Sequence, residues 1–238
     1  MRWIVLTLMV MGSLAVQAAD TGSPEKNIRQ SIELIAPDLE VTRIRPADVD
    51  GLYEVVLGTE VIYMTPDGRY MLRGELLDLE NQTNMTQSVR AQMRQKLLAD
   101  LPRDEMIRFS NGKSDHVIYV FTDIDCGYCR KLHQDVPSLV EQGVEVRYLA
   151  YPRAGLESDT FHEMESVWCS ADRKSALTQA KQGKKIETKP CDNPVAAQYE
   201  IGRKMGIRGT PAIYLENGRS LPGYVPPEEL LAILNGDG

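Results

Sequence analysis

The sequence predicts a mixed α/β protein built of two unequal parts, and three observations support this prediction. Short runs of β-branched and aromatic residues, separated by turn dipeptides, follow one helical pattern in the first third of the chain. A single long, polar helical pattern comes next. From about residue 107 strand and helix patterns alternate, which is typical of an α/β domain, and 238 residues are enough for two modest domains.

Composition and charge exclude several classes of protein. The chain is 42% hydrophobic and 26% charged, which is ordinary globular composition and excludes a mainly disordered chain. With 27 basic and 34 acidic residues, the net charge is −7. This charge provides no general basic field for a phosphate backbone, so we expect no nucleic-acid partner.

Residues 1–18 have the pattern of a secretory signal peptide. Met1 and Arg2 give a positive start, an almost uncharged apolar run follows over residues 3–16, and small residues end at Ala18. The alternative, a membrane anchor, needs roughly 20 apolar residues, more than this run provides. We therefore expect residues 1–18 to be removed and the mature protein to be exported to a compartment where disulfides persist.

Residues 19–80 are predicted to form a small α+β unit. Ile28, Ile32 and Ile35 have the spacing of one buried helix face, and Pro37 ends this pattern. Strand patterns then follow at residues 41–44, 52–57, 60–64 and 70–72. Asp-Gly dipeptides between them predict turns of an antiparallel meander.

This N-terminal unit is small for a domain that folds alone. About 60 residues without a cysteine bury too little surface for a stable isolated monomer. Open strand edges at residues 53–57 or 70–72 could pair with a second copy across a two-fold axis. Packing on the rest of the same chain is an equal alternative.

Residues 81–106 are predicted to be a linker that contains one long helix over residues 83–101. The apolar residues Met85, Val89, Met93 and Leu97 fall four apart, with polar residues between them. Such a narrow apolar stripe suits a connector between two domains.

Residues 107–238 are predicted to form an α/β domain with a mixed sheet. Strand patterns lie at residues 117–124, 144–151 and 212–215, and helix patterns at 129–141 and 227–234. Asn217-Gly218 predicts a hairpin turn after the third strand. The mostly helical stretch between the second and third strands, about residues 152–206, is predicted to be an insertion.

Cys126, Gly127, Tyr128 and Cys129 form a CxxC motif at the predicted start of a helix. Cysteines three apart on a first helical turn have Cα atoms about 5–6 Å apart, which suits a disulfide. Unpaired N–H groups and the helix dipole stabilise a thiolate at Cys126, so we expect Cys126 to be the nucleophile. Cys129 is then the resolving thiol, and Gly127 and Tyr128 occupy positions that tune the redox pair.

Other interpretations of these residues are weaker. A zinc site needs a second close pair of ligands, but Cys169 and Cys191 are far apart in the sequence, so we expect no metal. A purely structural CxxC disulfide would close too little chain to stabilise much. His133, two turns after Cys126, fits a packed or surface histidine better than a catalytic base. Asp125 opposes thiolate formation unless its side chain points into solvent.

Thr210-Pro211 stands directly before the third strand pattern, where a proline needs explaining because it cannot donate to the sheet. Together with the CxxC motif this dipeptide makes residues 109–238 resemble the thioredoxin superfamily. The closer resemblance, over nearly the whole mature chain, is to the DsbC-type family of periplasmic disulfide isomerases. The segments that carry it are Phe121-Thr122-Asp123-Ile124, Cys126-Gly127-Tyr128-Cys129, Lys131-Leu132-His133, Gly209-Thr210-Pro211-Ala212, Pro222-Gly223-Tyr224 and Pro226-Pro227.

The resemblance implies a fold and an assembly. It implies a thioredoxin-like catalytic domain with a helical insertion, and a cystatin-like N-terminal dimerisation domain joined to it by a linker helix. It also implies that Pro211 is cis and that Thr210 and Pro211 bind substrate peptide. A periplasmic homodimer and a membrane-bound reductase of the DsbD type as electron donor are further implications.

Cys169 and Cys191 are predicted to form a structural disulfide. Four cysteines allow three pairings, and assigning one pair to the CxxC motif leaves this one. The DsbC-type family also has a structural disulfide in this region. Closing this loop would stabilise the domain by roughly 3 kcal/mol in the chain-entropy model.

The predicted function is disulfide isomerisation in misfolded exported proteins, without a cofactor. Cys126 attacks a wrong substrate disulfide, and either a substrate thiol or Cys129 then releases the enzyme. A chaperone-like activity accompanies this chemistry in the family. The alternatives are a disulfide oxidant, a reductase of single oxidised thiols like the related DsbG, and a dimeric chaperone whose CxxC motif is incidental.

Overall fold

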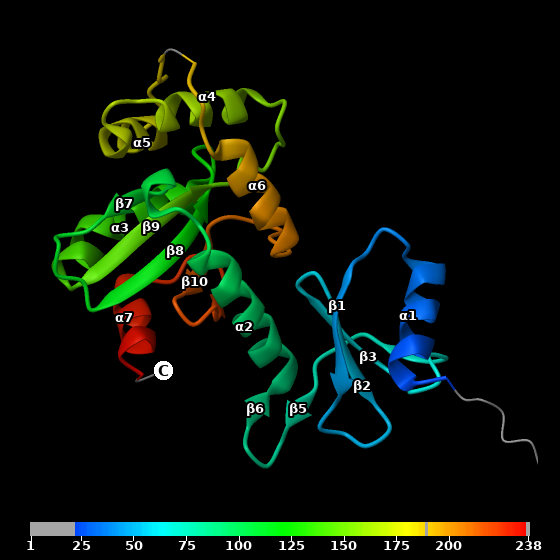
Figure 1. Ribbon diagram of the computed structural model, residues 1–238. Coiled ribbons are helices and arrows are strands. Elements are labelled where there is room, and N and C mark those ends of the chain that lie inside the picture. The colour runs from blue at the N-terminus through cyan, green and yellow to red at the C-terminus, as the bar shows by residue number, and fades with distance from the viewer. Residues whose placement is uncertain (1–21, 189, 237–238) are drawn as a thin grey trace, which may run out of the picture.

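The computed structural model describes residues 22–188 and 190–236, so the predicted signal peptide, residues 1–18, lies outside the described residues. The chain forms two units joined by helix α2, each with its own sheet (Figure 1). Within the described part of the chain, no helix is long and apolar enough to cross a membrane.

The N-terminal unit packs one helix against a four-stranded antiparallel sheet. Its elements are α1 (Pro24–Ile35), β1 (Val41–Pro46), β2 (Tyr53–Leu57), β3 (Glu60–Met64) and β4 (Met71–Leu72), with strand order β1-β2-β3-β4. The Ser23 side chain accepts a hydrogen bond from the backbone N–H of Lys26 and so begins α1. Ile28 and Ile32 then pack into a small core with β2 and β3, as the helical spacing predicts.

The strand order corrects one expectation about the edges of this sheet. Because β2 lies between β1 and β3, residues 53–57 are hydrogen-bonded on both sides and cannot pair with a second copy. Strand β4 is an edge strand. Its side chains and the residue before it are at least half exposed: Tyr70 57%, Met71 50% and Leu72 53%.

The segment between the two units differs from the predicted single helix over residues 83–101. It contains a two-stranded hairpin, β5 (Leu77–Asp78) with β6 (Thr83–Asn84), then α2 (Met85–Ala99) and the 3-10 helix η1 (Arg103–Glu105). The helix begins only at Met85 because Thr83 pairs with Asp78, and because the Asn84 side chain accepts the backbone N–H of Gln87 at 2.9 Å.

Helix α2 contributes to the cores of both units. Val89, in its first half, packs with Val56 and Val61 of the N-terminal sheet. Leu98, at its other end, packs with Tyr119 and Phe121 of the C-terminal sheet. The helix is therefore attached at each end, which fits the predicted role of a connector.

The C-terminal unit contains a mixed five-stranded sheet of order β11-β10-β8-β9-β7. Its strands are β7 (Ile107–Phe109), β8 (His116–Thr122), β9 (Val144–Ala150), β10 (Ala212–Leu215) and β11 (Ser220–Leu221). Strands β8 and β9 are parallel and the other pairs are antiparallel. Alternate residues of β8 point to opposite faces: Ile118 and Val120 into one core, Tyr119 and Phe121 into the other.

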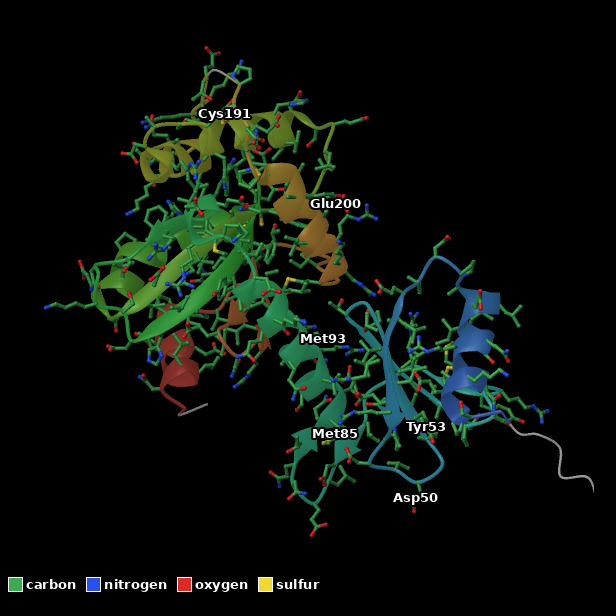
Figure 2. The ribbon with its side chains drawn as sticks, viewed as in Figure 1. Asp50, Tyr53, Met85, Met93, Cys191 and Glu200 are labelled. Atoms are coloured by element: carbon green, nitrogen blue, oxygen red, sulfur yellow. A yellow bond between two sulfur atoms is a disulfide. The ribbon has the colours of Figure 1, made fainter. Side chains whose placement is uncertain are left out.

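Helices cover both faces of this sheet. They are α3 (Gly127–Glu141), α4 (Asp159–Trp168), α5 (Arg173–Lys181), α6 (Val195–Lys204) and α7 (Pro227–Asn235). Helices α4 to α6 form the predicted insertion between β9 and β10, and Cys191 lies at its outer end (Figure 2). A disulfide joins Cys169 to Cys191, with Cα atoms 5.7 Å apart.

Candidate active site

The CxxC motif lies where strand β8 gives way to helix α3. Cys126 is the N-cap residue of α3, with extended backbone angles of φ −80° and ψ 120°. The helix begins at Gly127, two residues earlier than the predicted 129–141, because the backbone N–H of Arg130 already donates to the Cys126 carbonyl. Cys126 is 4% exposed and Cys129 is fully buried, and both are free thiols.

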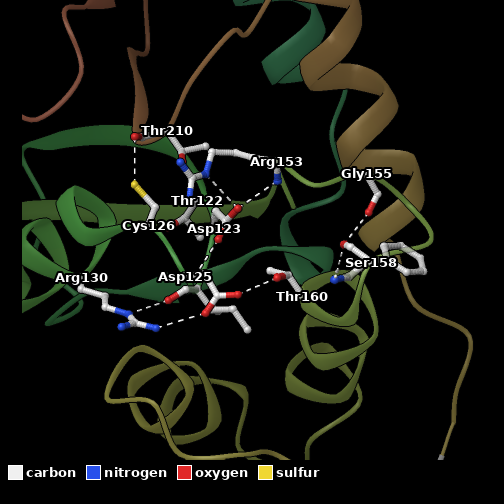
Figure 3. A network of polar contacts seen from close by, with 12 residues as sticks. Thr122, Asp123, Asp125, Cys126, Arg130, Arg153, Gly155, Ser158, Thr160 and Thr210 are labelled. Carbon is white, nitrogen blue, oxygen red and sulfur yellow. Dashed lines mark hydrogen bonds and ion pairs between the residues drawn. The ribbon is translucent and has the colours of Figure 1, made fainter.

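The loop before β10 lies against the Cys126 sulfur. The Thr210–Pro211 peptide bond is cis. In the thiol form, the S–H of Cys126 donates to the backbone carbonyl of Thr210 at 3.1 Å (Figure 3). The fold thus brings together Cys126, Thr210 and Pro211, which are far apart in the sequence.

The surroundings of Cys126 favour its thiolate. Burial raises the pKa of the thiol, but hydrogen bonding at Thr210 and with Cys129 lowers it. The positive charge of Arg153 acts in the same direction. The net result is a pKa below the ordinary cysteine value, as expected for a nucleophile.

Cys129 shows the opposite shift. Burial raises the pKa of its thiol above the ordinary value. The charge of Lys181 and hydrogen bonds involving Asp123, Thr210 and Thr122 lower this pKa but do not outweigh burial. Of the two thiols, the outer one therefore loses its proton more readily than the inner one.

Asp123 and Arg153 hold the loop that carries Cys126. The buried Asp123 carboxylate accepts the Arg153 backbone N–H at 2.9 Å and its Nε–H at 3.0 Å (Figure 3). Its other oxygen accepts the backbone N–H of Asp125 at 2.7 Å. Sequence spacing does not indicate a role for either residue in the site, because Arg153 reaches the loop only through the folding of β9 against β8.

Asp125 points away from the Cys126 sulfur (Figure 3). Its side chain is 56% exposed. One carboxylate oxygen pairs with Arg130 at 3.2 Å and the other accepts the hydroxyl of Thr160 at 2.6 Å. The side chain therefore faces solvent, Arg130 and Thr160, which is the alternative in which Asp125 does not oppose the thiolate.

His133 is a packed histidine. Its ring nitrogens lie 3.1 Å from the Tyr148 hydroxyl and 2.9 Å from that of Thr178. Burial, together with the charge of Lys181, lowers its pKa to about 4, so the ring is neutral at neutral pH.

Within residues 22–188 and 190–236 no group of three or more His, Cys, Asp or Glu side chains is arranged to hold a metal.

Aromatic side chains lie beside the CxxC motif at the surface. Tyr128 is 65% exposed and its ring stacks on that of Tyr224, with centroids 6.2 Å apart. The Tyr224 hydroxyl donates to Asp135 at 2.9 Å, and Lys131 lies over its ring. These contacts fix an aromatic surface next to the reactive sulfur.

Fold and site together define a class of protein: a thiol-disulfide oxidoreductase with a thioredoxin fold. Residues 103–236 match the family of thioredoxin-like domains, and residues 16–87 match the N-terminal domain of disulfide bond isomerase proteins. The chain belongs to the DsbC family of thiol:disulfide interchange proteins, which confirms the resemblance seen in its sequence.

Three similar proteins illustrate this membership. The chain is 35% identical over 236 residues to the thiol:disulfide interchange protein DsbC of Dickeya dadantii, covering 98% of this chain and 94% of that protein. It is 36% identical over 233 residues to DsbC of Escherichia coli, with the same coverage of 98% and 94%. A disulfide interchange protein from Neisseria gonorrhoeae is structurally similar at a TM-score of 0.51 and 31% identity, over 57% of this chain and 97% of that one.

Proposed function

We propose that this protein rearranges wrong disulfides in misfolded exported proteins, with Cys126 as nucleophile and Cys129 as resolving thiol. The observation that carries the proposal is the opposite shift of the two pKa values: that of Cys126 is lowered and that of Cys129 is raised. An outer thiolate can attack a substrate disulfide while the inner thiol waits as a neutral, buried group.

The chemistry proceeds through a mixed disulfide. The Cys126 thiolate attacks one sulfur of a substrate disulfide, a Cys126–substrate bond forms, and the other substrate sulfur leaves as a thiolate. In isomerisation, that or another substrate thiolate attacks the mixed disulfide and releases Cys126 unchanged. In reduction, Cys129 attacks Cys126, so the enzyme pair is oxidised and the substrate is reduced by two electrons.

Residues around the sulfur support substrate binding. Thr210 and Pro211 present their backbone beside Cys126, where an extended peptide can pair with it. Gly127 and Tyr128 complete the rim, and no atom lies within 4 Å of the place where a side chain of residue 127 would begin. The exposed Tyr128 offers apolar contact to an unfolded chain.

The proposal includes the assembly and the compartment. A homodimer formed through the N-terminal unit suits a domain this small, and a signal peptide at residues 1–18 suits export to the periplasm. A membrane-bound reductase of the DsbD type would return the oxidised Cys126–Cys129 pair to dithiol. A dimer that holds unfolded chain would also act as a chaperone.

Refolding of scrambled ribonuclease tests the catalytic assignment. We expect the wild type to restore activity and Cys126→Ser to lose this rescue, because the attacking sulfur is gone. Cys129→Ser is the matched control: it should form the mixed disulfide but release reduced substrate poorly. Equal rescue by wild type and Cys126→Ser would overturn the enzymatic proposal and leave the chaperone function.

A further inference from the structure

Lys181 is a buried lysine close to the CxxC pair. It is the last residue of α5, and it is 5% exposed. Leu177 and Ala180 on the same helix are also buried, so Lys181 continues the apolar face of α5. A lysine is almost never this buried without a partner of opposite charge, so its place in the core needs an explanation.

The contacts of Lys181 point toward the active site. Its Nζ donates to the hydroxyl oxygen of Thr122 at 2.7 Å and reaches the backbone carbonyl of Asp123 at 3.5 Å. The ammonium also lies over the Tyr148 ring, 5.5 Å from its centroid. In the described part of the chain Lys181 forms no ion pair, because no carboxylate oxygen lies within 4.0 Å of its Nζ. The shortest hydrogen bond of the Lys181 ammonium is thus to a neutral group, the Thr122 hydroxyl.

Thr122 is the hydrogen-bonding partner of Lys181 and also affects Cys129. Its side chain is fully buried at the end of β8, and its hydrogen bonding lowers the pKa of Cys129. A hydroxyl has one donor and two acceptor positions. In one state the Thr122 hydroxyl accepts a hydrogen bond from the Lys181 ammonium and donates one to a Cys129 thiolate. In the other state it accepts a hydrogen bond from the Cys129 thiol and donates one to a neutral Lys181 amine.

We propose that Lys181 is a positioning residue for the resolving step: it orients the Thr122 hydroxyl and accepts, through it, the proton of Cys129. This inference rests on the proposed function, in which Cys129 resolves a mixed disulfide. The transfer creates no net charge, because one neutral pair, thiol and amine, becomes one ion pair, thiolate and ammonium.

The resolving step conserves protons and electrons. The Cys129 proton passes to the Thr122 oxygen, and the hydroxyl proton of Thr122 passes to Lys181 Nζ. The Cys129 thiolate attacks Cys126, the Cys126–Cys129 bond forms, and the bond from Cys126 to the substrate sulfur breaks. That sulfur leaves with the electron pair as a thiolate, so the substrate is reduced and the enzyme pair is oxidised by two electrons.

Lys181 also lines a hollow at the surface. A hollow of about 260 Å³ between α3 and α5 is lined by Lys181 together with Arg130, His133, Gln134, Thr178 and Gln182. Polar groups on this lining can hold water that carries the proton away.

The surrounding groups set the pH at which Lys181 can accept. Facing it are Cys126, Cys129, Arg130 and His133 of α3, Asp123 of the loop after β8, and Tyr148 of β9. Burial lowers the pKa of Lys181 to about 8, while the cysteines and Asp123 raise it and Arg130 lowers it further. His133 is neutral. Burial raises the pKa of the Cys129 thiol, and the positive charge of Lys181 opposes this shift.

A single-turnover experiment on the full-length reduced protein tests the proposal. In the first phase Cys126 attacks Ellman's reagent, forms a mixed disulfide and releases one coloured nitrothiobenzoate; in the second phase Cys129 attacks Cys126 and releases the other nitrothiobenzoate. We expect the release rate of the wild type to rise with a midpoint near pH 8. Lys181→Met and Thr122→Val should slow release by roughly 100-fold at neutral pH and move the midpoint upward, leaving the first phase unchanged.

Two further variants separate the outcomes. Lys174→Met removes an exposed lysine of the same helix and should change nothing. Lys181→Arg keeps a positive charge but cannot accept a proton, so its release should stay slow. Wild-type release in Lys181→Met or in Lys181→Arg would overturn the proposal, as would equal slowing of both phases. Absence of the first phase in the wild type would instead contradict Cys126 as nucleophile.

Discussion

Arg153 combines a structural and an electrostatic effect on the reactive loop. It holds the Asp123 carboxylate, and its charge lowers the pKa of Cys126. We predict that Arg153→Met raises the Cys126 pKa, because one of the groups that stabilise the thiolate is lost. The ultraviolet absorbance of the thiolate, followed against pH, measures this shift.

Asp125 provides the matched control for that measurement. Its carboxylate is exposed and turned toward Arg130 and Thr160. Asp125→Asn is therefore expected to leave the Cys126 pKa within a few tenths of a unit of the wild type. A fall as large as the rise caused by Arg153→Met would show that the Asp125 charge reaches the sulfur.

His133 makes the stability of the protein depend on pH. Its pKa is about 4 in the folded protein and about 6.5 in the unfolded chain, so the unfolded chain binds more protons between these values. The contribution is therefore complete above pH 6.5 and is lost as the pH falls toward 4. We predict a loss of about 2 kcal/mol between pH 7 and pH 5. Urea unfolding at the two pH values measures it.

The variant that checks this origin is His133→Gln. Glutamine keeps polar atoms near Tyr148 and Thr178 but does not titrate, so the pH dependence above pH 5 should become flatter. An unchanged slope in this variant would assign the effect to other groups.

At the scale of residues, the sequence predicts what local spacing encodes and misses what the fold assembles. Cys126 and Cys129 follow from the CxxC spacing at a helix start. Arg153 and Lys181 reach the site only through β9 and α5, and a lysine pattern on a helix ordinarily indicates a solvated face. The one signal for Lys181 is its position four residues after Leu177, on the apolar face of α5.

At the scale of elements, the β10–β11 hairpin is docked tightly on α2. Gly218 has φ +80°, and a Cβ atom there would lie 1.9 Å from the carbonyl oxygen of Ala91. We predict that Gly218→Ala destabilises the protein by about 3 kcal/mol or more, because backbone strain and a clash with helix backbone act together. The free energy of unfolding in urea measures the loss.

Gly112→Ala separates these two causes. Gly112 also has a positive φ, +83°, but no atom lies within 4 Å of its added Cβ. This variant should cost roughly 1–2 kcal/mol, from backbone strain alone. Equal losses in both variants would show that the hairpin can shift away from α2.

The sequence predicts those elements whose residues show a clear hydrophobic periodicity. The Ile28–Ile32 spacing and the apolar run of β8 are strong patterns, and the structure has a helix and a strand there. Strands β5, β6 and β11 contain two residues each, which is too few to show an alternation. The start of α2 depended on a side-chain cap at Asn84, which competes with the helical pattern before it.

At the scale of the whole molecule, the edge strand β4 is the expected dimer seam. It is unpaired on its outer side and its side chains are half exposed. We predict that Leu72→Lys prevents formation of the proposed dimer at micromolar concentration, because a charge on the edge opposes strand pairing. Sedimentation velocity measures the change.

The other edge of the same sheet supplies the control. Thr42 is an exposed residue of β1, so Thr42→Lys should leave the dimer intact. Dissociation by Thr42→Lys but not by Leu72→Lys would move the seam to β1. The sequence alone could not choose between strands, since edge position depends on strand order rather than on composition.

The pairing of Cys169 with Cys191 bears on how the protein itself matures. These are consecutive cysteines in the chain, and so are Cys126 and Cys129. In a chain translocated from its N-terminus, the first two thiols emerge together and the last two follow. Oxidation in order of arrival already gives the native pairing. With the proposed export, we therefore expect a newly made copy to need no reshuffling of its disulfide.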